Sequence, residues 1–264
     1  MNVYPYLEAV REKRPLVHHL TNWVTIFDCA QVVKSFGASP VMAHAPEEVA
    51  DMAGMASSLV LNIGTLTSEF IESMKIAALA ANMKRIPVVL DVCGAGATSF
   101  RDKKSLEMLD AVRIDIIKGN GSEIARIAGL EVRTRGVDAT DVGADLHDIA
   151  SSLAKKRGCI VVITGKADFV VDANSVYIVQ NGDEMMSHVV GTGCMATSVI
   201  GTFVGASPAP DMLAAAAAGL SCFEIAAELA VKKCTGPASF KERLFDSIFH
   251  LKKEDVISMQ KVVP

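Results

Sequence analysis

The sequence is poor in aromatic residues and has no excess of basic ones. Only 5% of its 264 residues are aromatic, with one Trp and three Tyr, and 26 Lys and Arg are outnumbered by 30 Asp and Glu. A net charge of -4 disfavours binding to polyanions. The scarcity of aromatic side chains leaves little surface for stacking against bases. We therefore expect no nucleic-acid partner and no attraction to an anionic membrane.

Long hydrophobic runs and a secretory signal are also missing. No stretch reaches the roughly 18 purely apolar residues that suggest a membrane span, since Ser221, Glu224 and Glu228 interrupt the alanine-rich segment 211–231. Residues 1–14 carry mixed charges and lack the apolar core of a signal peptide. Half of the chain is hydrophobic, which a buried helix or an oligomer interface explains. We expect a cytoplasmic protein without a membrane segment.

Paired cysteine motifs are absent as well. The six cysteines are Cys29, Cys93, Cys159, Cys194, Cys222 and Cys234. None of them forms a C-x-x-C pair, and dispersed cysteines of this kind suit a reducing compartment, where most serve as small buried apolar residues. The pattern predicts neither disulfides nor a zinc site.

Apolar strands alternate with helical segments along the chain. Strands are expected at 16–21, 39–43, 58–63, 87–91, 114–118 and 160–164, with an edge hairpin over 168–172 and 175–180. Helices are expected at 3–14, 23–36, 67–84, 141–157, 192–205, 209–232 and 237–250, and shorter ones after 45–48 and 119–123. This order predicts an α/β fold whose mostly parallel sheet is covered by helices on both faces. No linker or shift in composition divides the chain, so we expect one domain over residues 1–264.

Polar residues follow several of these strands. Ligands of parallel sheets bind beyond the carboxyl ends of the strands, so these residues are expected to share a site. Asp91 and Glu123, at exposed ends of neighbouring strands, are placed to hold Mg²⁺ directly or through water. A turn-stabilising Asp91 and a helix-capping Glu123 are equally good interpretations of each residue alone. The hydroxyl of Thr164 and the N–H of Gly165 can meet a phosphate or ribose. Lys118 can neutralise phosphate charge, although a lysine at a strand end is more often simply solvated.

The segment 189–198 contains Gly191-Thr192-Gly193-Cys194 and predicts a tight turn that opens a helix. Glycine lets the backbone approach a ligand closely, and the free N–H groups and dipole of the first helical turn favour an anion such as phosphate. A Gly-x-Gly by itself is more often an ordinary turn before a buried helix. Cys194 lies where the helix dipole lowers a thiol pKa, so a reactive role and plain packing both stay open.

Taken in chain order, these motifs resemble those of the hydroxyethylthiazole kinases. The shared segments are 18–22, 37–43, 45–48, 61–66, Asp91 with 94–98, 119–123 and 191–195. Their common order from about residue 15 to 205 is far more specific than any single motif. The resemblance implies a three-layer ribokinase-like fold without a lid domain. It also implies a trimer with active sites between subunits, and phosphorylation of 4-methyl-5-(2-hydroxyethyl)thiazole with ATP and Mg²⁺ in thiamine salvage.

The resemblance further implies roles for individual residues. The thiazole would contact Met42, Asn22 and Gly191. ATP would contact Lys118, Thr164 and Asn120, while Asp91 and Glu123 would organise Mg²⁺. The catalytic anion hole would consist of Gly191, Thr192, Gly193 and Cys194. Related sugar kinases have an aspartate base where this chain, like the thiazole kinases, has Cys194.

Three positions depart from the family pattern. Residues 91–94 read Asp-Val-Cys-Gly where the family usually has Asp-Pro-Val-Gly, and His19 takes a position that is usually smaller. Lys118 stands where the family typically has arginine, so it keeps the charge but loses the planar, two-pronged grip on phosphate. These departures remove no group that the chemistry requires. They are expected to affect the affinity for ATP.

Three other functions fit parts of the sequence. A kinase of a pyrimidine or sugar alcohol would be expected to have aspartate in place of Cys194. A thiazole- or nucleotide-binding protein without turnover is suggested by the substitutions near Asp91 and at Lys118. A dinucleotide-dependent dehydrogenase is disfavoured because no G-x-G-x-x-G follows the first strand. The thiazole kinase is favoured over all three.

Overall fold

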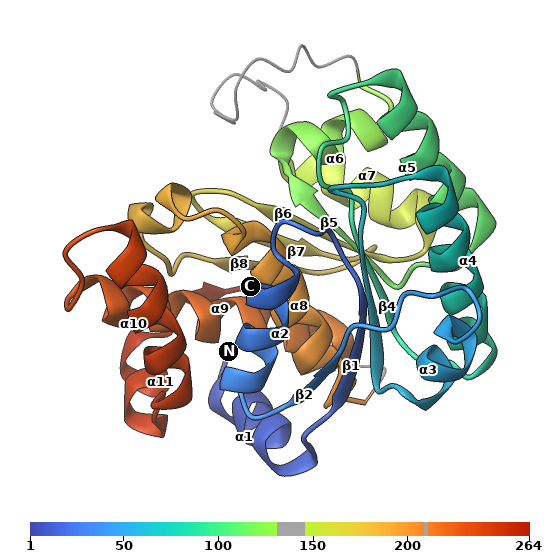
Figure 1. Cartoon of the computed structure of the whole chain (residues 1–264). Coiled ribbons are helices and arrows are strands. Elements are labelled where there is room, and N and C mark those ends of the chain that lie inside the picture. Colours follow the sequence, from blue (N-terminus) through green and yellow to red (C-terminus); the bar gives the residue numbers. More distant parts are fainter. Residues whose placement is uncertain (131–145, 209–210) are drawn as a thin grey trace.

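A single sheet runs through the computed structural model, which describes residues 1–130, 146–208 and 211–264 (Figure 1). Its strands are β1 Leu16–Leu20, β2 Ser39–Val41, β3 Ser58–Asn62, β4 Val88–Asp91, β5 Ile116–Asn120, β6 Ile160–Thr164, β7 Asp168–Val171, β8 Val176–Val179 and β9 Val262–Val263. They lie in the order β2-β1-β3-β4-β5-β6-β7-β8-β9. The pairs from β2 to β6 are parallel and those from β6 to β9 are antiparallel.

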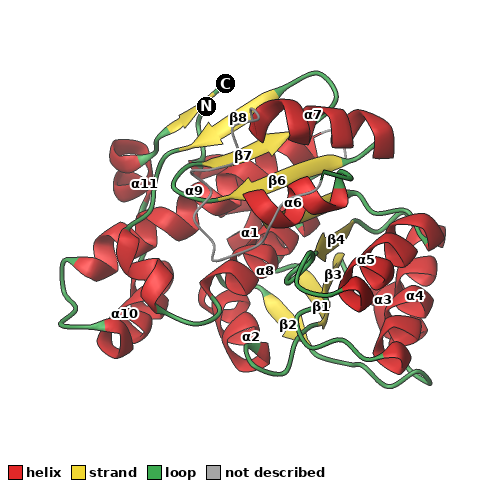
Figure 2. Cartoon of the chain, turned by 90° about the horizontal axis from the view of Figure 1, so that it is seen from above, coloured by secondary structure: helices red, strands yellow, loops and turns green. Residues whose placement is uncertain are grey.

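Helices cover both faces of this sheet. They are α1 Tyr4–Lys13, α2 Ile26–Ser35, α3 Val49–Met55, α4 Ser68–Met83, α5 Ser99–Ala111, α6 Gly121–Ile127, α7 Leu146–Arg157, α8 Thr192–Gly205, α9 Met212–Val231, α10 Pro237–Phe249 and α11 Lys253–Met259, with a 3-10 helix η1 at Glu184–His188. Helices α1, α2 and α8–α11 pack on one face, and α3–α7 pack on the other (Figure 2).

Two hydrophobic cores follow from this three-layer arrangement. Successive side chains of a strand point to opposite faces of the sheet. Val60 accordingly lies in the core under α8, while its neighbours Leu59 and Leu61 lie in the core under α4. Because both faces are covered, every residue of β3 and of β4 is buried. The α/β fold with a mostly parallel, doubly covered sheet is therefore confirmed.

Several element boundaries differ from the prediction. Helix α2 begins at Ile26 rather than near residue 23, because the Asn22 side chain accepts hydrogen bonds from the N–H and hydroxyl of Thr25 and shapes a turn there. The β7–β8 hairpin is not the sheet edge, since β9 pairs with β8. Helices α5 and α11 were not anticipated. The expected helix starts at 141–145 and 209–210 lie outside the described residues.

Helix α9 is the one helix in the described part of the chain that is long and apolar enough to cross a membrane. Its most apolar window is 78% buried within the protein. It packs between α8 and α10, and its alanines belong to the core on that face of the sheet. Helix α9 is therefore buried in the way that a core helix of a folded domain is.

Candidate active site

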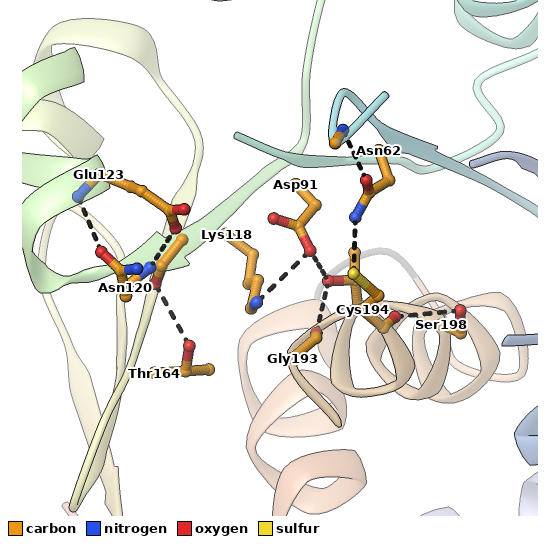
Figure 3. Close-up of polar contacts among 12 residues, drawn as sticks. Asn62, Asp91, Lys118, Asn120, Glu123, Thr164, Gly193, Cys194 and Ser198 are labelled. Atoms are coloured by element: carbon orange, nitrogen blue, oxygen red, sulfur yellow. Dashed lines mark hydrogen bonds and ion pairs between the residues drawn. The ribbon is translucent and has the colours of Figure 1, made fainter. Parts of the chain in front are cut away.

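Three neighbouring strands place Asn62, Asp91 and Lys118 side by side. In the parallel register, Asn62 is opposite Asp91, and Asp91 is opposite Lys118. The strand alternation directs all three side chains to the face that α8 covers. Figure 3 shows Asp91 and Lys118 between Cys194 of α8 and the group formed by Glu123, Asn120 and Thr164. The expected meeting of polar strand ends is thus observed.

Asp91 is a buried carboxylate with one satisfied oxygen. It is 1% exposed, and its Oδ2 accepts a 2.6 Å hydrogen bond from the Thr197 hydroxyl of α8. The same oxygen lies 3.4 Å from the Lys118 ammonium. Its Oδ1 is buried and has no hydrogen-bond partner among the described residues. A buried carboxylate oxygen is costly without a partner, so Oδ1 is suited to a cation.

Lys118 is also buried, with 4% of its surface exposed. Burial opposes its charge, but the carboxylates of Asp91 and Glu123 outweigh burial and raise the pKa of Lys118. Its Nζ lies 3.3 Å from the point where a Cβ on Gly193 would be. The alternative of a simply solvated lysine is therefore wrong. The charge instead sits between Asp91 and the first turn of α8.

Glu123 caps helix α6 and also reaches the loop after β4. Its Oε2 accepts from the Asn120 N–H at 2.8 Å, and Asn120 Oδ1 accepts from the Glu123 N–H at 2.9 Å. Its Oε1 accepts from the Gly94 N–H at 2.7 Å. Burial first, and then the charge of Asp91, raises the pKa of Glu123. The interpretation of Glu123 as a helix cap is confirmed. The expectation that Asp91 and Glu123 are exposed is wrong, since Asp91 is buried and Glu123 is half-buried.

The donor set suits a magnesium ion that arrives with phosphate. No group of three or more His, Cys, Asp or Glu side chains that could enclose a metal occurs among the residues the structure describes. Mg²⁺ commonly takes one or two carboxylates and fills its other positions with water and substrate phosphates. The orphaned Oδ1 of Asp91, with Glu123 close enough to influence it, fits that pattern and not an all-protein cage.

The start of α8 forms the predicted turn. Gly191 caps the helix with φ 97°, a left-handed conformation that glycine adopts without strain. A Cβ there would lie 2.7 Å from Cγ2 of Thr25. The Thr192 hydroxyl donates to the carbonyl of Met186 at 3.0 Å and so faces away from the helix opening. The N–H groups of residues 192–194 have no acceptor within the helix, and the Lys118 ammonium lies close to this first turn.

Cys194 is half-buried and receives hydrogen bonds from two asparagines. Its sulfur accepts from Nδ2 of Asn22 at 3.3 Å and from Nδ2 of Asn62 at 3.4 Å. A hydrogen bond from the Cys93 thiol, assisted by Lys118, lowers the pKa of Cys194 to about 6 against the opposing effects of burial and Asp91. This hydrogen bond to Cys194 first, and then burial, raises the pKa of Cys93. The Cys194 sulfur is thus the acceptor of this pair and its more acidic thiol.

Two residues of this site were missed in the sequence. Asn62 ends β3 within the shared segment 61–66, so its position at a strand end was an available signal. Cys93 belongs to the departure from the family pattern at 91–94. Its side chain reaches Cys194 although 101 positions separate the two residues, and no local pattern announces such a contact.

The remaining predicted residues lie further from Cys194. Thr164 is opposite Asn120 in the sheet, and its hydroxyl is 3.5 Å from the Gly119 carbonyl, on the side of Lys118 away from Cys194 (Figure 3). Met42 follows the edge strand β2 and is half-buried. The described contacts do not join Met42 to Cys194.

Comparison with a solved structure first defines the fold class of the protein. The chain is similar to a ribokinase-like superfamily protein from Enterococcus faecalis, with a TM-score of 0.62 at 13% identity over 92% of this chain and 93% of that one. The mostly parallel sheet covered by helices on both faces, together with this likeness, shows that the protein has a ribokinase-like fold.

Further comparisons identify the family within this fold class. The hydroxyethylthiazole kinase family pattern matches residues 7–254. A hydroxyethylthiazole kinase of Methanosarcina mazei is 55% identical over 256 residues, covering 97% of each chain. The structure of a hydroxyethylthiazole kinase from Pyrococcus horikoshii superposes with a TM-score of 0.90 at 37% identity, covering 99% of this chain and 98% of that one. The chain belongs to the hydroxyethylthiazole kinase family and is a kinase, with ATP as the co-substrate that such a family implies.

Proposed function

We propose that this chain transfers the γ-phosphoryl group of ATP to the hydroxyl of 4-methyl-5-(2-hydroxyethyl)thiazole, a step of thiamine salvage. The observation that carries the proposal is the position of Asp91 and Lys118 directly beneath the first turn of α8, beside a Cys194 held by two asparagines. The names of the relatives at 55% and 37% identity supply the substrate class.

ATP binds on the β5–β6 side of this site in our proposal. Lys118 and Asn120 lie in β5 and Thr164 ends the adjacent β6, and Lys118 carries the buried positive charge that a triphosphate needs. Asp91, through its free Oδ1, and Glu123, directly or through water, would hold Mg²⁺. The ion, when bound, offsets negative charge on the β- and γ-phosphates.

The substrate hydroxyl lies on the other side, near Cys194. The N–H groups of Thr192, Gly193 and Cys194 hold the charge of the transferring phosphoryl group, and fixed donors of this kind stabilise a transition state without reorganisation. Phosphoryl transfer has a loose transition state, so early removal of the hydroxyl proton is not required. The Cys194 thiolate therefore orients the hydroxyl and accepts its proton late, without forming a covalent intermediate.

The thiazole ring occupies the mouth of this site in our proposal, next to Asn22, Gly191 and Met42. A neighbouring subunit covers that mouth in a homotrimer. The support is a set of exposed apolar side chains that flank Asn22 and Gly191. They are Trp23, Val24, Phe27 and Val190, which are 51%, 68%, 73% and 72% exposed.

Sedimentation velocity tests the trimer. Phe27→Glu places a charge in the covered face and should yield monomers with a raised KM for the thiazole. Met83→Glu is the control, since Met83 is 81% exposed at the end of α4, on the opposite face of the sheet. A parent protein that sediments as a monomer at micromolar concentration contradicts the shared site.

We also place the enzyme in the cytoplasm and treat residues 1–264 as one catalytic domain. The site contains two free thiols in contact, Cys93 and Cys194, and a reducing compartment keeps such thiols reduced. All strands described join one sheet, and the predicted site residues lie along its carboxyl edge.

A coupled ADP-release assay over a panel of small heterocyclic alcohols tests the reaction. The hydroxyethylthiazole should give the highest kcat/KM and a pyrimidine alcohol a much lower one. Asp91→Asn, which keeps the shape of the side chain, should abolish most turnover and its Mg²⁺ dependence. Tight binding of thiazole and ATP without ADP release would instead identify a binding protein, and preference for another alcohol would replace the substrate.

A further inference from the structure

Arg101 of α5 joins the loops that follow the adjacent strands β3 and β4. Its guanidinium donates to the carbonyls of Ile63 at 3.0 Å and Gly64 at 2.7 Å, both beyond β3, and of Cys93 at 3.2 Å, beyond β4. No ion pair of the described residues involves Arg101. The planar guanidinium presents several donors in a fixed fork, so one side chain sets the spacing of three carbonyls.

The loop after β3 connects Arg101 to Cys194. Gly64 accepts from Arg101 through its carbonyl, and its N–H donates to Oδ1 of Asn62 at 2.9 Å. With Oδ1 engaged in this way, the Asn62 amide turns its Nδ2 toward the sulfur of Cys194, at 3.4 Å. The position of the Arg101 guanidinium is therefore transmitted to the thiol through two hydrogen-bonded residues.

The loop after β4 connects Arg101 to Glu123. Gly94 has φ 81°, and a Cβ there would lie 2.9 Å from Nη1 of Arg101, so the guanidinium rests against this backbone. The N–H of the same Gly94 donates to Oε1 of Glu123. Any shift of the guanidinium thus also moves the donor that orients the Glu123 carboxylate.

Arg101 is itself fixed at the start of its helix. Its N–H donates at 3.3 Å to the hydroxyl of Thr98, which caps α5. The neighbouring Asp102 accepts from the Gly96 N–H at 2.7 Å, which ties the helix to the same loop after β4. The start of α5 therefore holds Arg101 in place, in addition to the loop carbonyls that its guanidinium binds.

We infer that Arg101 is a positioning residue. It fixes the distance between the Asn62–Cys194 group, at the end of the site where the substrate hydroxyl binds, and Glu123, at the end where the phosphates bind. The inference rests on the proposed function for the meaning of these two ends. In-line transfer depends on their separation, and a displacement of about 1 Å costs on the order of 10²-fold in rate.

The test compares Arg101→Ala and Arg101→Lys with Lys103→Ala, an exposed position on the same helix. For the Arg101 variants we expect kcat to fall on the order of 10²-fold and the Mg²⁺ concentration for half-maximal ATP binding to rise. The rate of Cys194 alkylation by iodoacetamide, read by peptide mass spectrometry, should change severalfold. Millimolar guanidinium should restore part of the kcat of Arg101→Ala, while Lys103→Ala should match the parent protein throughout.

Two results overturn the inference. One is an unchanged kcat in a folded Arg101 variant. The other is a lower kcat with unchanged Cys194 alkylation and Mg²⁺ dependence, which would make Arg101 a general scaffold residue. If Arg101→Ala does not fold, Arg101→Lys decides by the same readouts. Alkylation and Mg²⁺–ATP binding need no turnover, so they test Arg101 even if the parent protein fails to phosphorylate the thiazole.

Discussion

The Thr197 hydroxyl donates a 2.6 Å hydrogen bond to Oδ2 of Asp91, and both side chains are buried. Thr197 lies three residues after Cys194, so this contact fixes the first turn of α8 against the end of β4. The helix N–H groups and the Asp91 carboxylate are thereby held at one distance. A second bond, from the Ser58 hydroxyl to the Gly201 carbonyl at 2.7 Å, holds the helix on β3 one turn later.

Thr197→Val should lower the free energy of unfolding by about 1.5–3 kcal/mol, since it removes a hydrogen bond to a buried charge. Urea denaturation measures this change, and kcat should fall as Asp91 loses its orientation. The control is Thr202→Val on the same helix, where the buried hydroxyl donates only to the Ser198 carbonyl. Equal losses in both variants would contradict a special role of the Asp91 contact.

The reactivity of Cys194 should depend on pH with a midpoint near its pKa of about 6. Below that pH the sulfur is protonated and alkylates slowly, and the rate should rise as pH increases through 6. Cys93→Ala removes the first cause of the low pKa and should move the midpoint upward, whereas Cys234→Ala should leave it in place. A parent midpoint above pH 8, the range of an ordinary thiol, would show that the thiolate is not stabilised.

Substitution of Cys194 tests whether it acts as a base or a nucleophile. Cys194→Ser should keep part of the activity, because a hydroxyl can still orient the substrate. Cys194→Asp should retain or raise it, since a carboxylate accepts the proton in this geometry. ADP release gives the rates, and ATP binding verifies that each variant is folded. A folded but inactive Cys194→Asp, or a trapped phosphocysteine, would overturn this role.

Lys118→Arg should tighten ATP binding by ~1 kcal/mol, because a guanidinium can grip phosphate with two hydrogen bonds. Isothermal titration with ATP measures the change, and Lys118→Met should weaken binding. Lys166→Arg, an exposed position just after β6, serves as the control. An unchanged Kd for ATP in both Lys118 variants would place the residue outside the nucleotide site.

Gly191→Ala should be destabilising as well as inactivating. A left-handed residue with a Cβ costs about 1–2 kcal/mol, and this Cβ would also meet Thr25 at 2.7 Å. Gly193→Ala is the comparison, since its Cβ would meet only the Lys118 Nζ, at 3.3 Å. It should change thermal stability little while weakening ATP binding. Similar melting temperatures for both variants would contradict the strain at Gly191.

The sequence by itself determined the layers and the edge of the sheet where the site lies. Buried parallel strands are continuous apolar runs, so β3, β4, β5 and β6 stand out, and polar residues that end them must meet at one edge. Asp91 and Lys118 could be brought together on that ground alone. Helix α5 could not be found, because it is largely polar and carries few apolar positions, and β9 is only two residues long.

Only the tertiary structure decided how deeply these residues are buried and what they contact. The burial of Asp91 depends on α8 lying across the sheet, and its bond to Thr197 spans 106 positions of the chain. The approach of Cys93 to Cys194, and the bridging of two loops by Arg101, likewise depend on the register of neighbouring strands. Periodicity describes which face of one element is apolar. It carries no information about which polar groups of distant elements come within hydrogen-bonding distance once those faces have packed.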